Sequence, residues 1–217
     1  MKKQLYLIPG TAANSKIFEQ IKLPSKQFEF HFLEWMMPES KNETIEHYAA
    51  RMCKNIKHKN PVLLGVSFGG IIAQEISKII NCEKIILISS VKNKRELPIK
   101  FRFIRATKFH HLFLVKSNNT LNRFISLIFK KNTQKRRDLY EEYLTFRDPL
   151  YINWAIKQTL EWKQKAALPN TIHLHGDKDI VFPIKYIKDC IRIDKGSHIM
   201  ILTKSKKINT VLLDYLK

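Results

Sequence analysis

One serine in this chain has the neighbours that a nucleophile requires. Residues 62–70 read Val-Leu-Leu-Gly-Val-Ser-Phe-Gly-Gly: an apolar run, then Gly-x-Ser-x-Gly, then a segment with helical spacing. The pattern predicts a sharp strand-to-helix turn that presents the Ser67 hydroxyl and places the next backbone N–H groups at a helix N-terminus, where they can bind an anion. Gly65 and Gly69 belong to this prediction because side chains at these positions would clash across the turn.

A serine hydroxyl becomes a strong nucleophile only beside a base, and the base needs a group that orients it. Downstream of Ser67, aspartates stand at 177 and 179 in the run 175–183, His-Gly-Asp-Lys-Asp-Ile-Val-Phe-Pro, and His198 follows a Gly-Ser pair. We expect His198 to remove the Ser67 proton and later to protonate the leaving group. Asp179 or Asp177 would hold the imidazole and stabilise its charged form.

The elements that must position these residues alternate along the chain. We expect strands over 4–8, 28–35, 61–66, 84–90, 171–175 and 190–193, and helices over 44–57, 68–80 and 205–216. Short apolar strands that alternate with helices predict an α/β fold, with a mostly parallel sheet of about six strands covered on both faces. Ligands bind at the carboxyl ends of such strands, where the candidate residues fall.

The order Ser67, Asp179, His198 on this framework resembles the α/β-hydrolase superfamily, in particular its small capped esterases and thioesterases. Three segments carry the resemblance: Gly-Val-Ser-Phe-Gly at 65–69, the His-Gly-x-x-Asp run that ends in Pro183, and Gly-Ser-His at 196–198. The distance from Asp179 to Pro183 matches the family run. We therefore assign the triad acid to Asp179 and leave Asp177 to the turn.

The resemblance also implies an oxyanion hole made of two backbone N–H groups, those of Phe68 and Thr11. The family often has His-Gly after its early strand, whereas this chain has Pro9–Gly10. Gly10 keeps the glycine that permits the tight turn. The missing histidine is not a triad member, so the departure concerns the loop and leaves the triad intact.

A helical insertion interrupts the alternation of strands and helices. We expect residues 1–90 and 167–217 to form the core and 91–166 to form a helical cap, which is rich in aromatic residues. Asp148 lies in this insertion and is a third, less favoured candidate for the triad acid.

Positive charge is concentrated in one part of the chain. Of the formal net charge of +20, much lies at 92–137, which holds fourteen Lys or Arg and a single acidic residue, Glu96. A basic patch attracts anionic partners, although a general lysine bias would also raise the charge.

These residues predict a serine hydrolase that cleaves a carboxylic ester or thioester through an acyl-enzyme intermediate, without a metal or organic cofactor. An aromatic cap suits an acyl chain, and a basic cap suits an anionic group at the other end of the substrate. An acyl group on an acidic acyl carrier protein or on coenzyme A fits both features. The superfamily resemblance includes esterases of that kind, which cleave methyl esters of carrier-bound pimeloyl groups. Lys130, Lys131, Arg136 and Arg137 are the cap residues through which we expect such recognition.

Two other functions stay open from the sequence. The same triad positions serve C–C bond hydrolysis and lyase chemistry in this superfamily, and the fold also carries non-catalytic binding proteins. No nucleic-acid-binding motif accompanies the basic charge, so we predict no specific nucleic-acid partner.

Cysteine usage and the N-terminus predict a cytoplasmic location. The cysteines at 53, 82 and 190 are scattered, odd in number and without metal-ligand spacing, which favours reduced thiols. The first residues predict a strand rather than a signal peptide, because Pro9 follows too soon for a signal-peptide core. The longest apolar runs are too short for a transmembrane segment.

Overall fold

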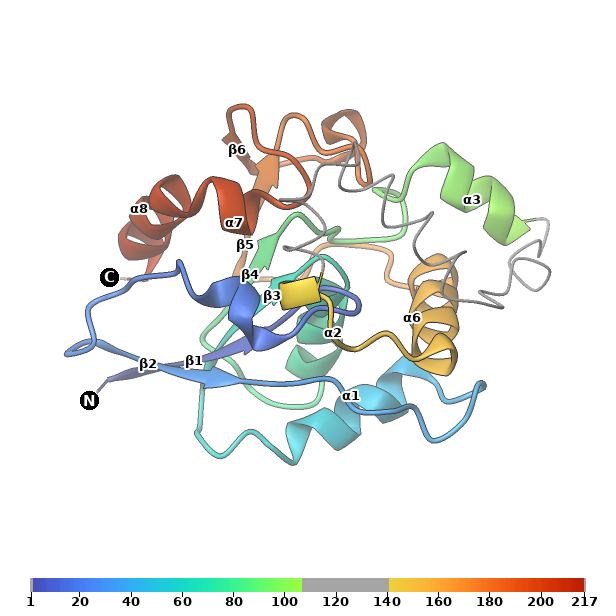
Figure 1. The fold of residues 1–217 in the computed structure, drawn as a ribbon, viewed down its shortest axis with the longest axis horizontal. Helices are drawn as coiled ribbons and strands as arrows, with labels where there is room; N and C mark the ends of the chain where they lie inside the picture. The colour runs from blue at the N-terminus through green and yellow to red at the C-terminus, as the bar shows by residue number, and fades with distance from the viewer. Residues whose placement is uncertain (1, 107–140, 217) are drawn as a thin grey trace.

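Six parallel strands form the central sheet of the computed structural model, which describes residues 2–106 and 141–216 (Figure 1). The strands are β1 (Lys3–Ile8), β2 (Phe28–Phe32), β3 (Val62–Val66), β4 (Lys84–Ile88), β5 (Thr171–Gly176) and β6 (Ile191–Ile193). Their order is β2-β1-β3-β4-β5-β6, and every neighbouring pair is parallel. This arrangement confirms the predicted α/β class and the predicted number of strands.

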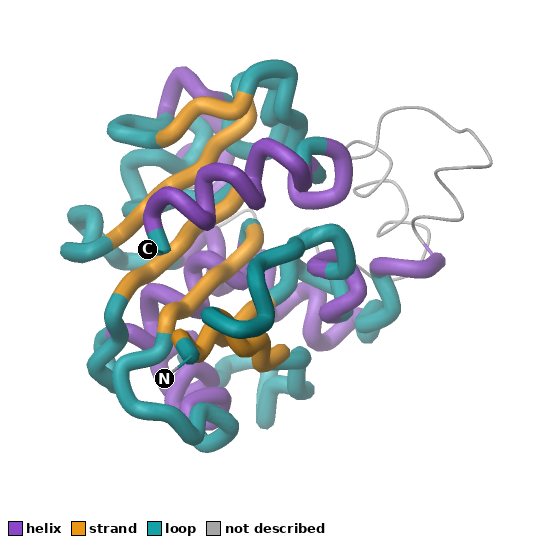
Figure 2. The backbone as a smooth tube through the Cα atoms, turned by 90° about the vertical axis from the view of Figure 1, so that its left-hand side faces the viewer, coloured by secondary structure: helices purple, strands orange, loops and turns teal. Residues whose placement is uncertain are grey.

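Helices cover both faces of the sheet. They are α1 (Ile45–Cys53), α2 (Phe68–Ser77), α3 (Ile99–Ala106), α6 (Pro149–Glu161), α7 (Met200–Thr203) and α8 (Ser205–Tyr215), with short 3-10 turns η1 (Ser15–Phe18) and η3 (Ile184–Tyr186). Helix α2 packs against β1, β3 and β4, with α1 beside it. Figure 2 shows α8, next to the C-terminus, in front of the strands and other helices behind them. Coverage on both faces explains why β3 is an uninterrupted apolar run in which every residue is buried.

The strand order creates a switch point between β1 and β3. From β1 the chain proceeds to β2 on one side of the sheet, and then returns across β1 to β3 and continues to the other side. Ile8, the last residue of β1, lies opposite Gly65 near the end of β3. The loops after these two strands therefore start side by side and diverge, which is where α/β sheets form their ligand crevices.

The second strand is shorter than predicted. The alternation over 28–35 predicts a strand to residue 35, but β2 ends at Phe32. Its sheet partner is β1, which ends at Ile8, and the next residue is Pro9, which has no N–H to offer. Without a partner the chain leaves the sheet after Leu33 donates to Leu7 O at 3.0 Å.

Helices α3 and α6 belong to the expected insertion at 91–166. They pack against each other on one side of the molecule, and α6 lies beyond the carboxyl ends of β1 and β2 (Figure 1). Residues 107–140 lie outside the described residues, and with them Lys130, Lys131, Arg136, Arg137 and most of the basic cluster. The division into a core and a cap thus stays a prediction. In the described ranges, no helix has both the length and the apolar composition to cross a membrane.

Candidate active site

Ser67 stands at the junction of β3 and α2 in a backbone conformation that most residues avoid. Its φ is 53° and its ψ is −119°. A non-glycine residue in such a region costs free energy and persists only where the surroundings hold it. Three hydrogen bonds do so: Ser67 N donates to Ile88 O at 3.0 Å, and Ser67 O accepts from Gly70 N at 3.0 Å and from Ser90 Oγ at 2.7 Å. The turn therefore presents the Ser67 side chain at the carboxyl edge of the sheet.

Gly65 and Gly69 permit the backbone contacts that shape this turn. A Cβ on Gly65 would lie 2.3 Å from Gly69 O, and a Cβ on Gly69 would lie 2.2 Å from Pro9 O. Both distances are far below van der Waals contact, and the atoms in the way are backbone. The turn and the end of β1 can approach this closely only where both positions lack a side chain.

The sequence predicts that Gly10 permits a tight turn through the conformational freedom of glycine, but the structure does not use that freedom at position 10. Gly10 has no positive φ, and the left-handed residue of the turn after β1 is Ala12, with φ 64°. The freedom of glycine is therefore not what the turn needs at position 10. A Cβ on Gly10 would lie 3.6 Å from Ser67 Cβ, an ordinary contact. The loop that carries Thr11 thus lies directly against the serine.

Ser67, His198 and Asp179 form a continuous hydrogen-bonded chain. Ser67 Oγ lies 3.0 Å from His198 Nε2, and His198 Nδ1 lies 2.8 Å from Asp179 Oδ2. The ring nitrogen that donates to the carboxylate leaves the other as an acceptor for the serine hydroxyl. Burial raises the pKa of Asp179, but the charge and the hydrogen bond of His198 outweigh burial and hold this pKa below its ordinary value. Asp179 is therefore an ionised partner for the imidazole.

A close backbone contact joins the loops that carry Asp179 and His198. A Cβ on Gly176 would lie 2.2 Å from Gly196 O, and Lys178 N donates to the same carbonyl at 2.9 Å. The sequence shows both glycines next to the candidate residues but does not show that they touch. Their contact fixes the distance between the aspartate and the histidine.

The other two candidates for the triad acid, Asp177 and Asp148, form hydrogen bonds with groups outside the triad. Asp177 Oδ2 accepts from Arg192 Nη2 at 2.9 Å. Asp148 caps the N-terminus of α6, where its side chain accepts from Leu150 N at 2.8 Å. Of the three aspartates considered, the one that contacts His198 is Asp179.

Two buried histidines that the sequence leaves without a catalytic role support the Asp179 loop. His175 Nε2 donates to Phe182 O at 2.8 Å and lies 3.5 Å from Asp179 Oδ2. His175 Nδ1 is thereby left as an acceptor, and His173 Nε2 lies 3.1 Å from it. Burial lowers the pKa of His175 and lowers the pKa of His173 well below its ordinary value, so both rings are neutral at neutral pH.

We expect this histidine pair to make the protein less stable in mild acid. Above about pH 7 neither the folded nor the unfolded chain protonates these rings. Below about pH 6.5 the unfolded chain takes up protons that the folded chain does not, so stability falls with pH until the lowered pKa of each ring in the folded chain is reached. Melting temperatures measured from pH 8 to pH 5 should fall less steeply for His173→Gln than for the wild type. Parallel curves would show that His173 does not titrate on unfolding.

Ser90 also belongs to the site, although no sequence pattern predicted it. Its hydroxyl donates to Ser67 O, and it follows β4, whose Ile88 pairs with Val66 of β3. The available signal is its place just past the carboxyl end of an apolar strand. A serine there has no further pattern that would single it out.

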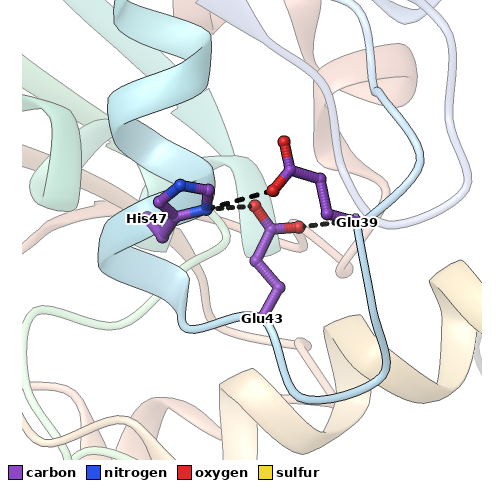
Figure 3. Close-up of side chains that lie close together, drawn as sticks. All are labelled: Glu39, Glu43 and His47. Atoms are coloured by element: carbon purple, nitrogen blue, oxygen red, sulfur yellow. Dashed lines mark hydrogen bonds and ion pairs between the residues drawn. The ribbon is translucent and has the colours of Figure 1, made fainter.

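Glu39, Glu43 and His47 bring possible metal-ligand atoms within 4.8 Å of one another (Figure 3). Arg51 already pairs with the buried carboxylate of this group, because its Nε and Nη2 donate to the two oxygens of Glu43 at 2.8 and 2.9 Å. Burial raises the pKa of Glu43, but hydrogen bonds from Arg51, the Glu39 backbone and His47 hold this pKa below its ordinary value. Trp154 Nε1 of α6 donates to Glu43 O at 2.8 Å. We assign the cluster to anchoring α6 rather than to metal binding.

Comparison with solved structures shows that known proteins share the fold of this chain. A thermophilic esterase from Thermogutta terrifontis superposes with a TM-score of 0.70 at 15% identity, covering 100% of this chain and 90% of its own. MenH from S. aureus superposes with a TM-score of 0.68 at 16% identity, covering 99% of this chain and 93% of its own. An epoxide hydrolase from Bacillus megaterium superposes with a TM-score of 0.68 at 14% identity, covering 100% of this chain and 94% of its own. Neither a protein-family model nor a curated protein matches the sequence.

The chain has the α/β-hydrolase fold, which is the fold that the resemblance of its three sequence segments implied. The names of two of these neighbours state different activities, an esterase and an epoxide hydrolase, so the shared fold does not by itself select a reaction. The chemistry has to be argued from the side chains of the site.

Proposed function

We propose that this protein is a serine hydrolase that cleaves a carboxylic ester or thioester through an acyl-enzyme intermediate. The observation that carries the proposal is the unbroken hydrogen-bonded chain from Ser67 Oγ through His198 to Asp179. It joins a nucleophile, a base and an orienting carboxylate, which together meet the requirements of acyl transfer.

The proposed reaction assigns each member one task. Ser67 Oγ attacks the acyl carbonyl carbon while His198 Nε2 takes the hydroxyl proton. The tetrahedral intermediate collapses, the bond to the alcohol or thiol breaks, and His198 returns the proton to that leaving group. Water then attacks the acyl-enzyme with His198 again as base, which releases the acid and restores Ser67. Asp179 stays ionised and stabilises the imidazolium.

Backbone N–H groups of Phe68 and Thr11 would bind the oxyanion. Phe68 is the first residue of α2, so its N–H has no partner within the helix. Thr11 follows Gly10, which lies against Ser67. Within 2–106 and 141–216, neither N–H donates to a protein acceptor. Removing one such donor typically costs about 100- to 1,000-fold in rate.

For the substrate, we propose an acyl group linked to an acidic carrier protein or to coenzyme A. The support is the cluster of positive charge at 92–137. Of its described members, Arg95, Lys100 and Arg102 are exposed, the last two on α3. Clustered positive charge raises the local concentration of an anionic substrate.

Labelling by a fluorophosphonate tests the proposed chemistry. Intact-protein mass should show one adduct on the native protein, none on Ser67→Ala and none on heat-denatured wild type, because only the assembled triad activates the serine. A folded wild type that takes no adduct would contradict the proposal.

The substrate class is tested by comparing the turnover of acyl-carrier and acyl-coenzyme A substrates with that of simple esters. Product analysis separates hydrolysis from C–C bond or lyase chemistry.

A further inference from the structure

Trp35 contacts both segments that carry the proposed oxyanion hole. Its indole Nε1 donates to Gly10 O at 2.9 Å. Its ring stacks on Phe68, with centroids 5.5 Å apart and planes 28° apart. The side chain is 6% exposed, so the indole is enclosed by protein. One buried side chain thus connects the loop after β1 to the residue after the serine.

Peptide geometry extends the effect of this hydrogen bond to the Thr11 N–H. In a trans peptide the C=O and the following N–H point in opposite directions, and the described chain has no cis peptide. Gly10 O is held by Trp35 Nε1 and by Ala13 N, which donates at 3.0 Å. A carbonyl fixed on the Trp35 side therefore directs the Thr11 N–H away from Trp35.

The rest of the loop is held as well. Ala12 has φ 64°, and its carbonyl accepts from Phe146 N at 3.0 Å. The segment just before α6 therefore holds Ala12, which follows the Gly10–Thr11 peptide, through this hydrogen bond. At the Gly10–Thr11 peptide itself, Gly10 O accepts from Ala13 N within the loop and from one side chain outside the loop, the indole of Trp35.

We infer that Trp35 is a positioning residue of the oxyanion hole, which orients the Thr11 N–H and sets its place relative to the Phe68 N–H. The inference rests on the proposed function. Trp35 acts through the backbone and does not touch the substrate. Oxyanion donors stabilise the transition state only when they are already aimed at the developing charge, so a loosened Gly10–Thr11 peptide lowers kcat.

Trp154 provides the matched control for a merely structural role. It is 1% exposed and packs edge-on against the same Phe68 ring at 5.8 Å. Its Nε1 also donates to a backbone carbonyl, that of Glu43, at 2.8 Å. Trp154→Phe and Trp35→Phe thus each remove one buried indole and one hydrogen bond, but only Trp35→Phe removes a hydrogen bond from Gly10 O, which then keeps the one from Ala13 N.

The test compares the two variants in kcat, KM, melting temperature and affinity for a trifluoromethyl ketone that mimics the tetrahedral intermediate. We expect Trp35→Phe to lower kcat by about 10- to 100-fold and ketone affinity by a similar factor, with KM within about threefold. Trp154→Phe should lower the melting temperature comparably and keep kcat within about threefold. If Trp35→Phe does not fold, benzothienylalanine at position 35 keeps the bicyclic shape and removes only the N–H.

Two results have different consequences. An active wild type in which the Trp35 and Trp154 variants lose the same factor in kcat overturns the inference and leaves the proposed function standing. A wild type that neither hydrolyses esters nor takes the fluorophosphonate overturns the proposed function and this inference together.

Discussion

An Asp179→Asn variant should lose about 10⁴-fold in kcat while it keeps its fold. Asp179 Oδ2 accepts from His198 Nδ1 at 2.8 Å. An asparagine amide can donate at that position, which favours the tautomer that carries its proton on Nε2. That nitrogen then cannot accept the Ser67 proton, and substitutions of this kind cost about four orders of magnitude in serine hydrolases. Steady-state kinetics with a simple ester, together with a melting curve, measures the loss and checks the fold.

Asp177→Asn is the control because the same change is made two residues away. Its carboxylate, whose side chain is 3% exposed, pairs with the exposed Arg192 and not with His198. We expect kcat within about threefold of the wild type, because Asp177 pairs with Arg192 and the carboxylate on His198 is that of Asp179. The loss of stability should be small, because an ion pair with an exposed arginine contributes at most about 1 kcal/mol. Equal losses in both variants would contradict the assignment of the acid to Asp179.

Gly69→Ala should cause a large loss of stability through the addition of a single methyl group. The new Cβ would lie 2.2 Å from Pro9 O and 2.4 Å from Ile8 O. These atoms belong to the end of β1, which has strands on both sides, so they cannot move without displacing the sheet. Overpacking of this kind costs about 1–3 kcal/mol where neighbours can adjust, and we expect the upper end or failure to fold. Urea unfolding followed by circular dichroism measures the difference.

Gly10→Ala is the matched comparison one residue beyond Pro9. Its Cβ would make its closest contact at 3.6 Å, with Ser67 Cβ, and Gly10 has no positive φ. We expect an unfolding free energy within about 1 kcal/mol of the wild type. If the two variants were equally stable, the backbone contact at Gly69 would not be what shapes the turn.

The sequence by itself determined the features that depend on short-range patterns. Apolar runs and helical spacing predict the six strands and the helices after them, because a buried strand or an amphipathic helix shows its period within a few residues. Ser67 is predictable because Gly65 and Gly69 lie beside it in the chain. Asp179 and His198 each follow a predicted strand, and the choice of Asp179 over Asp177 rests on the resemblance of its distance to Pro183 to the family run.

Only the tertiary structure decided which distant residues meet. Strand β2 stops at Phe32 because its partner β1 stops at Ile8, and that pairing is not visible in either segment alone. The contacts of Trp35 with Gly10 and of Gly176 with Gly196 likewise join segments that the sheet order brings together. Local periodicity reports which face of an element is buried, but not the partner that buries it. The orientation of the proposed oxyanion donors therefore becomes visible only when the strands are assembled.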